Sequence, residues 1–258
     1  MNLDAVALIG RANPQKPGVS PFSPMGSCIC VDPDGVVATC CHTLINFFER
    51  WSPYAVPKGP DVKEVIEDAE RHERPWFFFP SKFAWQPSGR THEGGAYPML
   101  SFQADRLLDI AVVELGGSGV DRPLPFVRIA RFPAEVGDKV RFAGFYDSGV
   151  LKDRDGYLRG WPMCKDEASV ICSTPNGFLI DYPVRRGMSG SGVFNGEGGL
   201  VGIIVEYWSP EFAAKQVGIE KSLGLCANAH LLIPQYQKLR LEAEARAADG
   251  DLPWCTLT

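Results

Sequence analysis

Ser189 stands in a glycine-rich stretch, Gly187-Met188-Ser189-Gly190-Ser191-Gly192, which an apolar run follows. Glycine adopts positive φ without a Cβ clash, so the peptide N–H groups of such a loop can converge around one exposed hydroxyl. N–H donors beside a nucleophile stabilise the oxyanion that develops during acyl transfer. Clusters of glycine and serine also mark ordinary hairpin turns. The stretch therefore indicates catalysis only if a base and an acid are found elsewhere.

A serine hydroxyl is a poor nucleophile near neutral pH and needs a base to take its proton. The chain has four histidines, His42, His72, His92 and His230. His42 directly follows an apolar hairpin that can hold its ring in place. His72 and His92 stand in charged or polar runs, and His230 precedes a predicted helix as a capping or packing residue. His42 is the predicted base.

Asp109 is the predicted acid, because the apolar run 110–113 follows it and would half-bury its carboxylate. A buried carboxylate requires a committed partner, such as an imidazole N–H. A strand-opening aspartate that bonds its local backbone fits the same pattern. His42, Asp109 and Ser189 come in that order, separated by 67 and 80 residues. This is the order of chymotrypsin-like enzymes and differs from the serine–acid–histidine order of α/β-hydrolases.

The elements that must position these residues are predicted to be short strands. Two β-prone runs, 26–31 and 36–39, flank a turn at Asp32-Pro33-Asp34-Gly35 and predict a hairpin. Residues 49–95 are predicted to be an irregular insertion with a short helix from Asp61 and a cluster of aromatic residues, interpreted as a satellite core or a peptide-binding ledge. A closing helix is predicted from Leu232 to Ala243. The remaining predicted strands are 4–12, 96–102, 109–115, 126–130, 138–146, 149–153, 157–164, 168–173, 177–184, 191–195, 199–207 and 222–227.

Composition narrows the class of protein. The 258 residues are 45% hydrophobic with a net charge of −5, which gives no basic face for nucleic acid. No apolar run approaches the roughly 20 residues of a membrane span, and the N-terminus does not resemble a signal peptide. We therefore expect a cytoplasmic protein whose eight cysteines are reduced. The run Cys40-Cys41-His42 lacks a second ligand pair at zinc-finger spacing, so no metal and no cofactor are expected.

Four motifs of the chain resemble those of trypsin-like serine peptidases and occur in the same order. The resemblance is closest to the protease domain of the HtrA/Deg branch. The stretch 26–42 is similar to that branch's hairpin before its histidine, and Asp109-Ile110-Ala111-Val112 is similar to its aspartate motif. Residues 136–144 resemble the strand that opens its second barrel. Residues 187–195 with 200–203 resemble its serine segment and the next strand. The resemblance covers roughly residues 4 to 236, without 49–95, and no PDZ domain is expected.

The resemblance implies two six-stranded antiparallel β-barrels with a cleft between them. It divides the chain into a lobe of residues 1–120 with His42 and Asp109, a lobe of residues 121–246 with Ser189 and the terminal helix, and a tail or linker of residues 247–258. His42 would be the general base, Asp109 the orienting acid and Ser189 the nucleophile. The backbone N–H groups of Gly187 and Ser189 would form the oxyanion hole. Met188 replaces the family's usual Asn or Asp, which leaves the conformation of this loop open.

The sequence thus predicts a serine endopeptidase that cuts protein or peptide substrates through an acyl-enzyme, regulated by a protein partner or additional domains. The alternative is a catalytically silent trypsin-like fold that binds peptides. Pro183 falls where trypsin keeps its acidic pocket base, so a preference for arginine or lysine is not expected on that ground, and an apolar residue is expected in the first pocket. Glu206 could supply an acid from the opposite wall or be a solvated strand end. The residues predicted to line the substrate pocket are Tyr182, Pro183, Val184, Arg186, Ile204, Val205 and Glu206.

Overall fold

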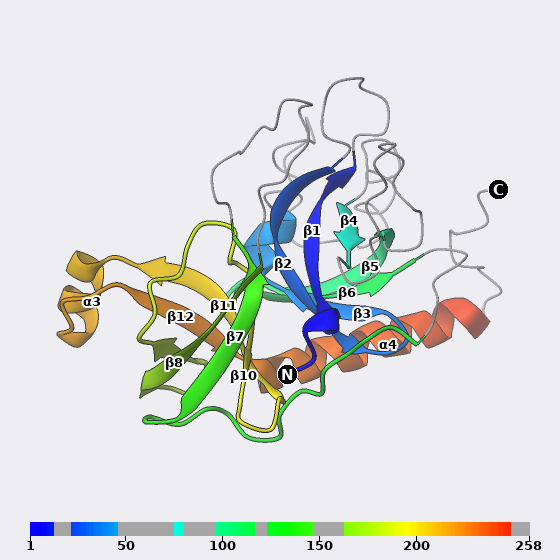
Figure 1. Ribbon diagram of the computed structural model, residues 1–258. Coiled ribbons are helices and arrows are strands. Elements are labelled where there is room, and N and C mark those ends of the chain that lie inside the picture. The colour runs from blue at the N-terminus through cyan, green and yellow to red at the C-terminus, as the bar shows by residue number, and fades with distance from the viewer. Residues whose placement is uncertain (13–21, 46–74, 80–95, 117–122, 147–162, 249–258) are drawn as a thin grey trace, which may run out of the picture.

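The computed structural model describes residues 1–12, 22–45, 75–79, 96–116, 123–146 and 163–248. The strands form two closed antiparallel barrels of six strands each, which confirms the predicted all-β fold class. The strand order is β1-β2-β3-β6-β5-β4 in the first barrel and β10-β11-β12-β9-β8-β7 in the second. The barrels lie side by side, and helix α4 extends along the outside of the first (Figure 1). The expected lobe boundary near residue 120 falls outside the described residues.

The first barrel confirms the predicted hairpin before His42. The Asp32 side chain accepts a hydrogen bond from the Asp34 N–H at 2.7 Å, and Gly35 takes φ of 92° to close the turn. This is the local side-chain capping that favours aspartate and glycine in turns. A short 3-10 helix, η1 (Leu3–Ala5), precedes the barrel. Its strands are β1 (Val6–Ala12), β2 (Phe22–Asp32), β3 (Val36–Thr39), β4 (Pro75–Phe78), β5 (Ala96–Asp105) and β6 (Ile110–Leu115).

Strand β4 corrects the prediction that residues 49–95 form only an irregular insertion. It pairs with β1 on one side and with β5 on the other. Phe77 and Phe79 are fully buried, and Phe79 meets Tyr97 edge to face at 5.8 Å between ring centroids. The aromatic cluster is thus partly barrel core. The strand can begin at Pro75, because a proline is tolerated at the first residue of a strand. The helix predicted from Asp61 lies outside the described residues.

The second barrel matches most predicted strands, but not the one at 126–130. That segment bonds both barrels in turn: the Val127 N–H donates to the Cys30 carbonyl at 2.9 Å, and the Ala130 N–H to the Leu200 carbonyl at 2.8 Å. It therefore crosses between the sheets, with a single bridge at Ile129. The predicted strand 149–153 and most of the predicted strand 157–164 lie outside the described residues, and residues 163–164 belong to the same strand as the predicted 168–173. The strands are β7 (Lys139–Phe145), β8 (Met163–Ser173), β9 (Gly177–Ile180), β10 (Gly192–Phe194), β11 (Leu200–Trp208) and β12 (Leu223–Asn228).

Helix α3 (Pro210–Val217) was not predicted, although its end signals are present in the sequence. The Ser209 hydroxyl accepts from the Phe212 N–H at 3.3 Å, and Gly218 closes the helix at φ of 71°. Eight residues are too few for a clear helical period, so only the caps could have indicated it. The predicted closing helix is confirmed as α4 (Leu232–Ala248), after the 3-10 turn η4 (Ala229–Leu231).

An apolar cluster of the first barrel continues into the second barrel, which also has a separate core cluster of its own. A single buried cluster combines residues of the first barrel with Phe194, Leu200 and Ile203 of the second. The buried Ser27 hydroxyl also bridges the barrels, because it accepts from the Phe145 N–H at 2.7 Å and lies 3.3 Å from the Phe145 carbonyl oxygen. Residues on facing edges of the two barrels are therefore held in a fixed relation. Within the described residues, no helix has the length and apolarity needed to cross a membrane.

Candidate active site

His42 lies in a helical turn, residues 41–45, that starts two residues after β3 ends. The strand itself is fully buried, which fixes the start of this turn against the core. The His42 Nδ1 is 2.6 Å from the Asp109 Oδ2, and the His42 backbone N–H donates to the Asp109 Oδ1 at 2.8 Å. One carboxylate therefore holds both the ring and the main chain of the same histidine. This geometry orients the imidazole more rigidly than a single hydrogen bond would.

Asp109 occupies the left-handed region of the backbone, with φ of 53°, directly before β6. Aspartate is one of the few residues besides glycine that tolerates this region. The turn before it is capped by Asp105, whose carboxylate accepts from the Leu107 and Leu108 N–H groups at 2.9 and 3.0 Å. The Asp109 carbonyl accepts from the Cys41 N–H at 3.2 Å. The carboxylate thus bonds a residue 67 positions away, as the sequence predicted, and not its local backbone.

Ser189 lies in the second of two consecutive tight turns. In the first, the Met188 N–H donates to the Arg185 carbonyl at 3.0 Å, with Gly187 at φ of 89°. A positive φ at the third position is the pattern of a type II turn, which fixes the orientation of the peptide before Gly187. In the second turn, the Ser191 N–H donates to the Met188 carbonyl at 2.9 Å. Neither the Gly187 nor the Ser189 N–H donates to a backbone carbonyl of the described residues, so both remain available to a ligand.

Met188, the departure from the family pattern, has a structural explanation. Its side chain is completely buried in the core of the second barrel, and its sulfur accepts from the Arg185 N–H at 3.2 Å. A flexible thioether is well suited to fill an irregular gap in a core. On the other side, the Ser27 N–H of β2 donates to the Ser189 carbonyl at 2.8 Å. The serine loop is therefore held by the core of one barrel and by a strand of the other.

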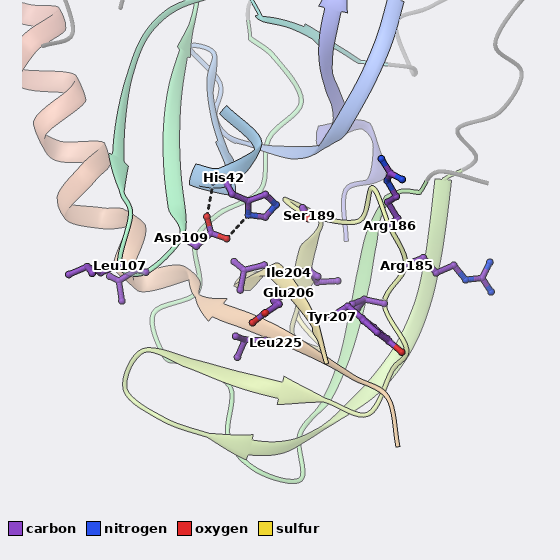
Figure 2. Close-up of a pocket in the computed structure, with 13 residues that line it drawn as sticks. His42, Leu107, Asp109, Arg185, Arg186, Ser189, Ile204, Glu206, Tyr207 and Leu225 are labelled. Carbon is purple, nitrogen blue, oxygen red and sulfur yellow. Dashed lines mark hydrogen bonds and ion pairs between the residues drawn. The ribbon is translucent and has the colours of Figure 1, made fainter. Parts of the chain in front are cut away.

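A cleft of about 520 Å³ is lined by all three residues of the predicted triad, whereas Gly187 is not among its lining residues. In the view of Figure 2, Ser189 lies on the side of the imidazole opposite Asp109. Five of the seven predicted substrate-binding residues line the cleft, namely Val184, Arg186, Ile204, Val205 and Glu206. The complete lining is His42, Leu107, Leu108, Asp109, Val184, Arg185, Arg186, Ser189, Ile204, Val205, Glu206, Tyr207 and Leu225.

Tyr182 and Pro183 were predicted to line the cleft but lie outside it. The Tyr182 ring packs on Phe142 at 4.4 Å between centroids, and its hydroxyl lies 3.6 Å from the Cys164 sulfur. Burial, reinforced by that hydrogen bond, raises the pKa of Tyr182 to about 12. Pro183 is exposed beside it. The chain reaches the cleft only at Val184, so the two residues before it turn toward the barrel core and the solvent.

Five lining residues are absent from the predicted list: Leu107, Leu108, Arg185, Tyr207 and Leu225. Leu107 is 97% exposed, which is unusual for a leucine and places an apolar side chain at the rim of the cleft. Its position two residues before the predicted acid was the one available signal. Leu225 reaches the cleft because it pairs with Glu206 across β11 and β12. That pairing follows a register shift between Ile204 and Glu206, which strand periodicity alone does not reveal.

Cys40, His42 and Asp109 are close enough to be considered as metal ligands, since their donor atoms lie within 4.8 Å of one another. The candidate ligand atoms of all three residues already take part in hydrogen bonds. The imidazole and the carboxylate bond each other, and the fully buried Cys40 thiol donates to the Ile204 carbonyl at 3.1 Å. Burial holds the pKa of the Cys40 thiol well above its usual value, with the Asp109 charge adding to the effect. A neutral thiol is a poor metal ligand, so the three residues do not fit a metal site.

Comparisons with known proteins agree with this geometry. The family model described as "Trypsin-like peptidase domain" matches residues 26–203, which include all three residues of the predicted triad. No curated protein sequence matches the chain. Among solved structures, the chain is similar to Rv3671c from M. tuberculosis H37Rv, solved as an inactive serine-to-alanine mutant. The identity is 13% and the TM-score 0.51, over 92% of this chain and 87% of that one, which shows a shared fold. Because the family model covers more than half of its length, this chain belongs to the family of trypsin-like peptidase domains.

Proposed function

We propose that the chain is a serine endopeptidase in which Ser189 is the nucleophile, His42 the general base and Asp109 the orienting acid. The observation that carries the proposal is the paired bonding of His42 to Asp109 at 2.6 and 2.8 Å in the cleft that Ser189 lines. A proton on Nδ1, donated to the Asp109 carboxylate, leaves Nε2 as the acceptor nitrogen. That nitrogen is the one that must take the proton of the serine hydroxyl.

The reaction would proceed in two halves. His42 Nε2 takes the Ser189 proton while Oγ attacks the carbonyl carbon of the substrate, and the oxygen becomes negatively charged. The free N–H groups of Gly187 and Ser189 would stabilise that charge. His42 then protonates the leaving amine, and the acyl group stays on Ser189. In the second half, His42 activates a water that hydrolyses the ester and restores the serine.

The edge of β11 supports a polypeptide as the substrate. Strand β10 pairs with β11 only as far as Ile203, and the Gly190 N–H then bonds the Ile204 carbonyl at 2.9 Å. Beyond this point, residues 206–208 of β11 pair with β12 on one side and with no described strand on the other, and Val205 lies at the register shift. An extended peptide can add to such an edge through main-chain hydrogen bonds. The edge leads away from Ser189 along the cleft and would align the acyl side of a substrate.

Labelling by a fluorophosphonate tests the proposal, because this reagent forms a covalent bond only with an activated serine. We expect the wild-type chain to be labelled and Ser189→Ala to be unlabelled. Ser191→Ala is the matched control, since Ser191 is two residues away and buried, and it should keep the labelling. A folded wild type without labelling, or equal labelling of Ser189→Ala, would overturn the proposal. Peptide binding without cleavage would then favour the silent binding module.

A further inference from the structure

The cleft combines apolar walls with a single carboxylate that is free for a ligand. Val184, Ile204, Val205 and Leu225 provide aliphatic surface, and the acidic lining residues are Asp109 and Glu206. Both oxygens of Asp109 are occupied by His42. Glu206 therefore supplies the negative charge that a substrate side chain would meet.

Glu206 is held in position by its neighbours on β11 and β12. The Trp208 indole N–H donates to the Glu206 Oε2 at 3.1 Å, from the residue two positions along the same strand. Leu225 lies directly opposite Glu206 on β12. In Figure 2, the carboxylate lies between Ile204 and Leu225. The Trp208 bond leaves Oε1 free, and within the described residues no Lys or Arg forms an ion pair with Glu206.

The two arginines of the cleft do not neutralise Glu206. The Arg185 guanidinium carbon lies 5.0 Å from the centroid of the Tyr146 ring, which is a cation–π contact. In the view of Figure 2, the charged ends of Arg185 and Arg186 both point away from Glu206. Both side chains are exposed. Water at the rim therefore screens their charge. Glu206 is exposed as well, and it lines the same cleft as Ser189.

We propose that Glu206 selects lysine or arginine at the substrate residue whose carbonyl Ser189 attacks, an inference that rests on the proposed function. The aliphatic stem of such a side chain would pack on Val184, Ile204 and Leu225, and its cationic end would pair with Oε1. The acid comes from the wall formed by β11. It does not come from the segment before the serine, where Pro183 lies outside the cleft.

Matched peptides that differ only at this residue test the selection. They carry lysine, arginine, norleucine or glutamate, of which norleucine has the stem of lysine without its charge. For the wild type, we expect kcat/KM to be at least roughly tenfold higher for lysine and arginine than for norleucine, decreasing with added salt. In Glu206→Gln this preference should disappear, because kcat/KM should fall for the lysine and arginine peptides far more than for the norleucine peptide. Glu197→Gln, the same charge change on an exposed loop, should keep the preference.

Binding to Ser189→Ala separates this inference from the proposed function, because it requires no catalysis. We expect the lysine peptide to bind at least roughly tenfold more tightly than the norleucine peptide, and Glu206→Gln in the same background to remove the difference. Loss of fluorophosphonate labelling with retained lysine selectivity would overturn the peptidase and leave the selection intact. Equal binding of lysine and norleucine, a preference for glutamate, or a preference that survives Glu206→Gln would overturn the selection.

Discussion

Gly190 lies so close to Ser27 that a Cβ at Gly190 would be 1.9 Å from the Ser27 carbonyl oxygen. Gly190 also takes φ of 86°, and its N–H donates to the Ile204 carbonyl at 2.9 Å. In the same β2 segment, the Ser27 N–H donates to the Ser189 carbonyl at 2.8 Å, and the Thr39 hydroxyl donates to the Ser27 carbonyl at 2.8 Å. The position of the proposed nucleophile thus depends on direct backbone contact between the two barrels.

Gly190→Ala is expected to abolish fluorophosphonate labelling and to lower the free energy of unfolding strongly. The left-handed conformation alone costs alanine about 1–2 kcal/mol, and the clash with Ser27 adds about 1–3 kcal/mol of overpacking. Gly137→Ala is the control, because Gly137 has φ of 94° and no atom within 4 Å of its Cβ position. In urea unfolding, this control should show only the cost of the left-handed conformation, without the cost of a clash. Equal costs for both variants would contradict the role of the contact.

Asp109→Asn is expected to reduce kcat by roughly 10³–10⁴-fold with little change in stability. Asparagine tolerates φ of 53° and fits the same space, but its amide favours the wrong tautomer of His42. Asp105→Asn, in the same turn, is the control: its side-chain oxygen can still accept from Leu107, and kcat should stay within a few-fold of wild type. Kinetics on one peptide substrate, with circular dichroism of each variant, provides the measurement. A kcat near wild type in Asp109→Asn would contradict the proposed acid.

Turn chemistry made the first barrel predictable from the sequence. Asp32 and Gly35 mark a hairpin whose bonding the structure confirms, and the buried strand after Asp109 has the expected apolar run. Strand β4 was not predictable in the same way, since it has four residues and pairs with partners that are distant in sequence. Residues 126–130 have strand composition, yet their backbone groups are divided between two barrels. The local strand propensity of a segment does not indicate how its backbone hydrogen bonds are divided between distant partners.

For the candidate site, the order and spacing of the motifs indicated which residues come together. The sequence did not indicate in which direction each side chain points. His42 and Asp109 were paired from their contexts, and the structure places them in contact. Tyr182 was predicted to line the pocket as part of the segment before Ser189, but its ring packs against the barrel core. Which residues of a loop face a cleft depends on the packing of the whole barrel. An exposed Leu107 at the rim is likewise a property of the folded surface.

Thiol reactivity should divide the seven described cysteines into two groups. Burial raises the pKa of Cys41 to about 11 and that of Cys30 to about 12, and it also raises the pKa values of Cys28, Cys40 and Cys226. Because the thiolate is the reactive form, a raised pKa slows reaction at pH 8. In a Cys255→Ser background we expect two fast equivalents with a disulfide reagent, from the half-buried Cys164 and Cys172.

Denaturant supplies the control for this count, since urea should expose all seven thiols. Cys172→Ala should lose one fast equivalent, whereas Cys226→Ala should lose none. More than two fast equivalents in the native protein would contradict the burial of the thiols near His42.

Arg246 should anchor α4 to the first barrel more strongly than Arg240 on the same helix. The Arg246 guanidinium bonds both the Glu114 carboxylate and the Ser101 hydroxyl, and the Arg246 and Glu114 side chains are only 29% and 20% exposed. Arg240 lies 3.7 Å from Asp34, with 41% and 54% exposure, so water screens that pair.

Arg246→Ala is therefore expected to lower the free energy of unfolding by about 2 kcal/mol, because it leaves a half-buried carboxylate with Ser101 as its remaining partner. Arg240→Ala should cost at most about 1 kcal/mol. Both variants make the same change in helix propensity, so their difference in urea unfolding isolates the tertiary contact. A smaller effect for Arg246→Ala than for Arg240→Ala would show that the Glu114 pair does not hold the helix. In that case, the coupling free energy between Arg246→Ala and Ser101→Ala in a double-mutant cycle should be zero as well.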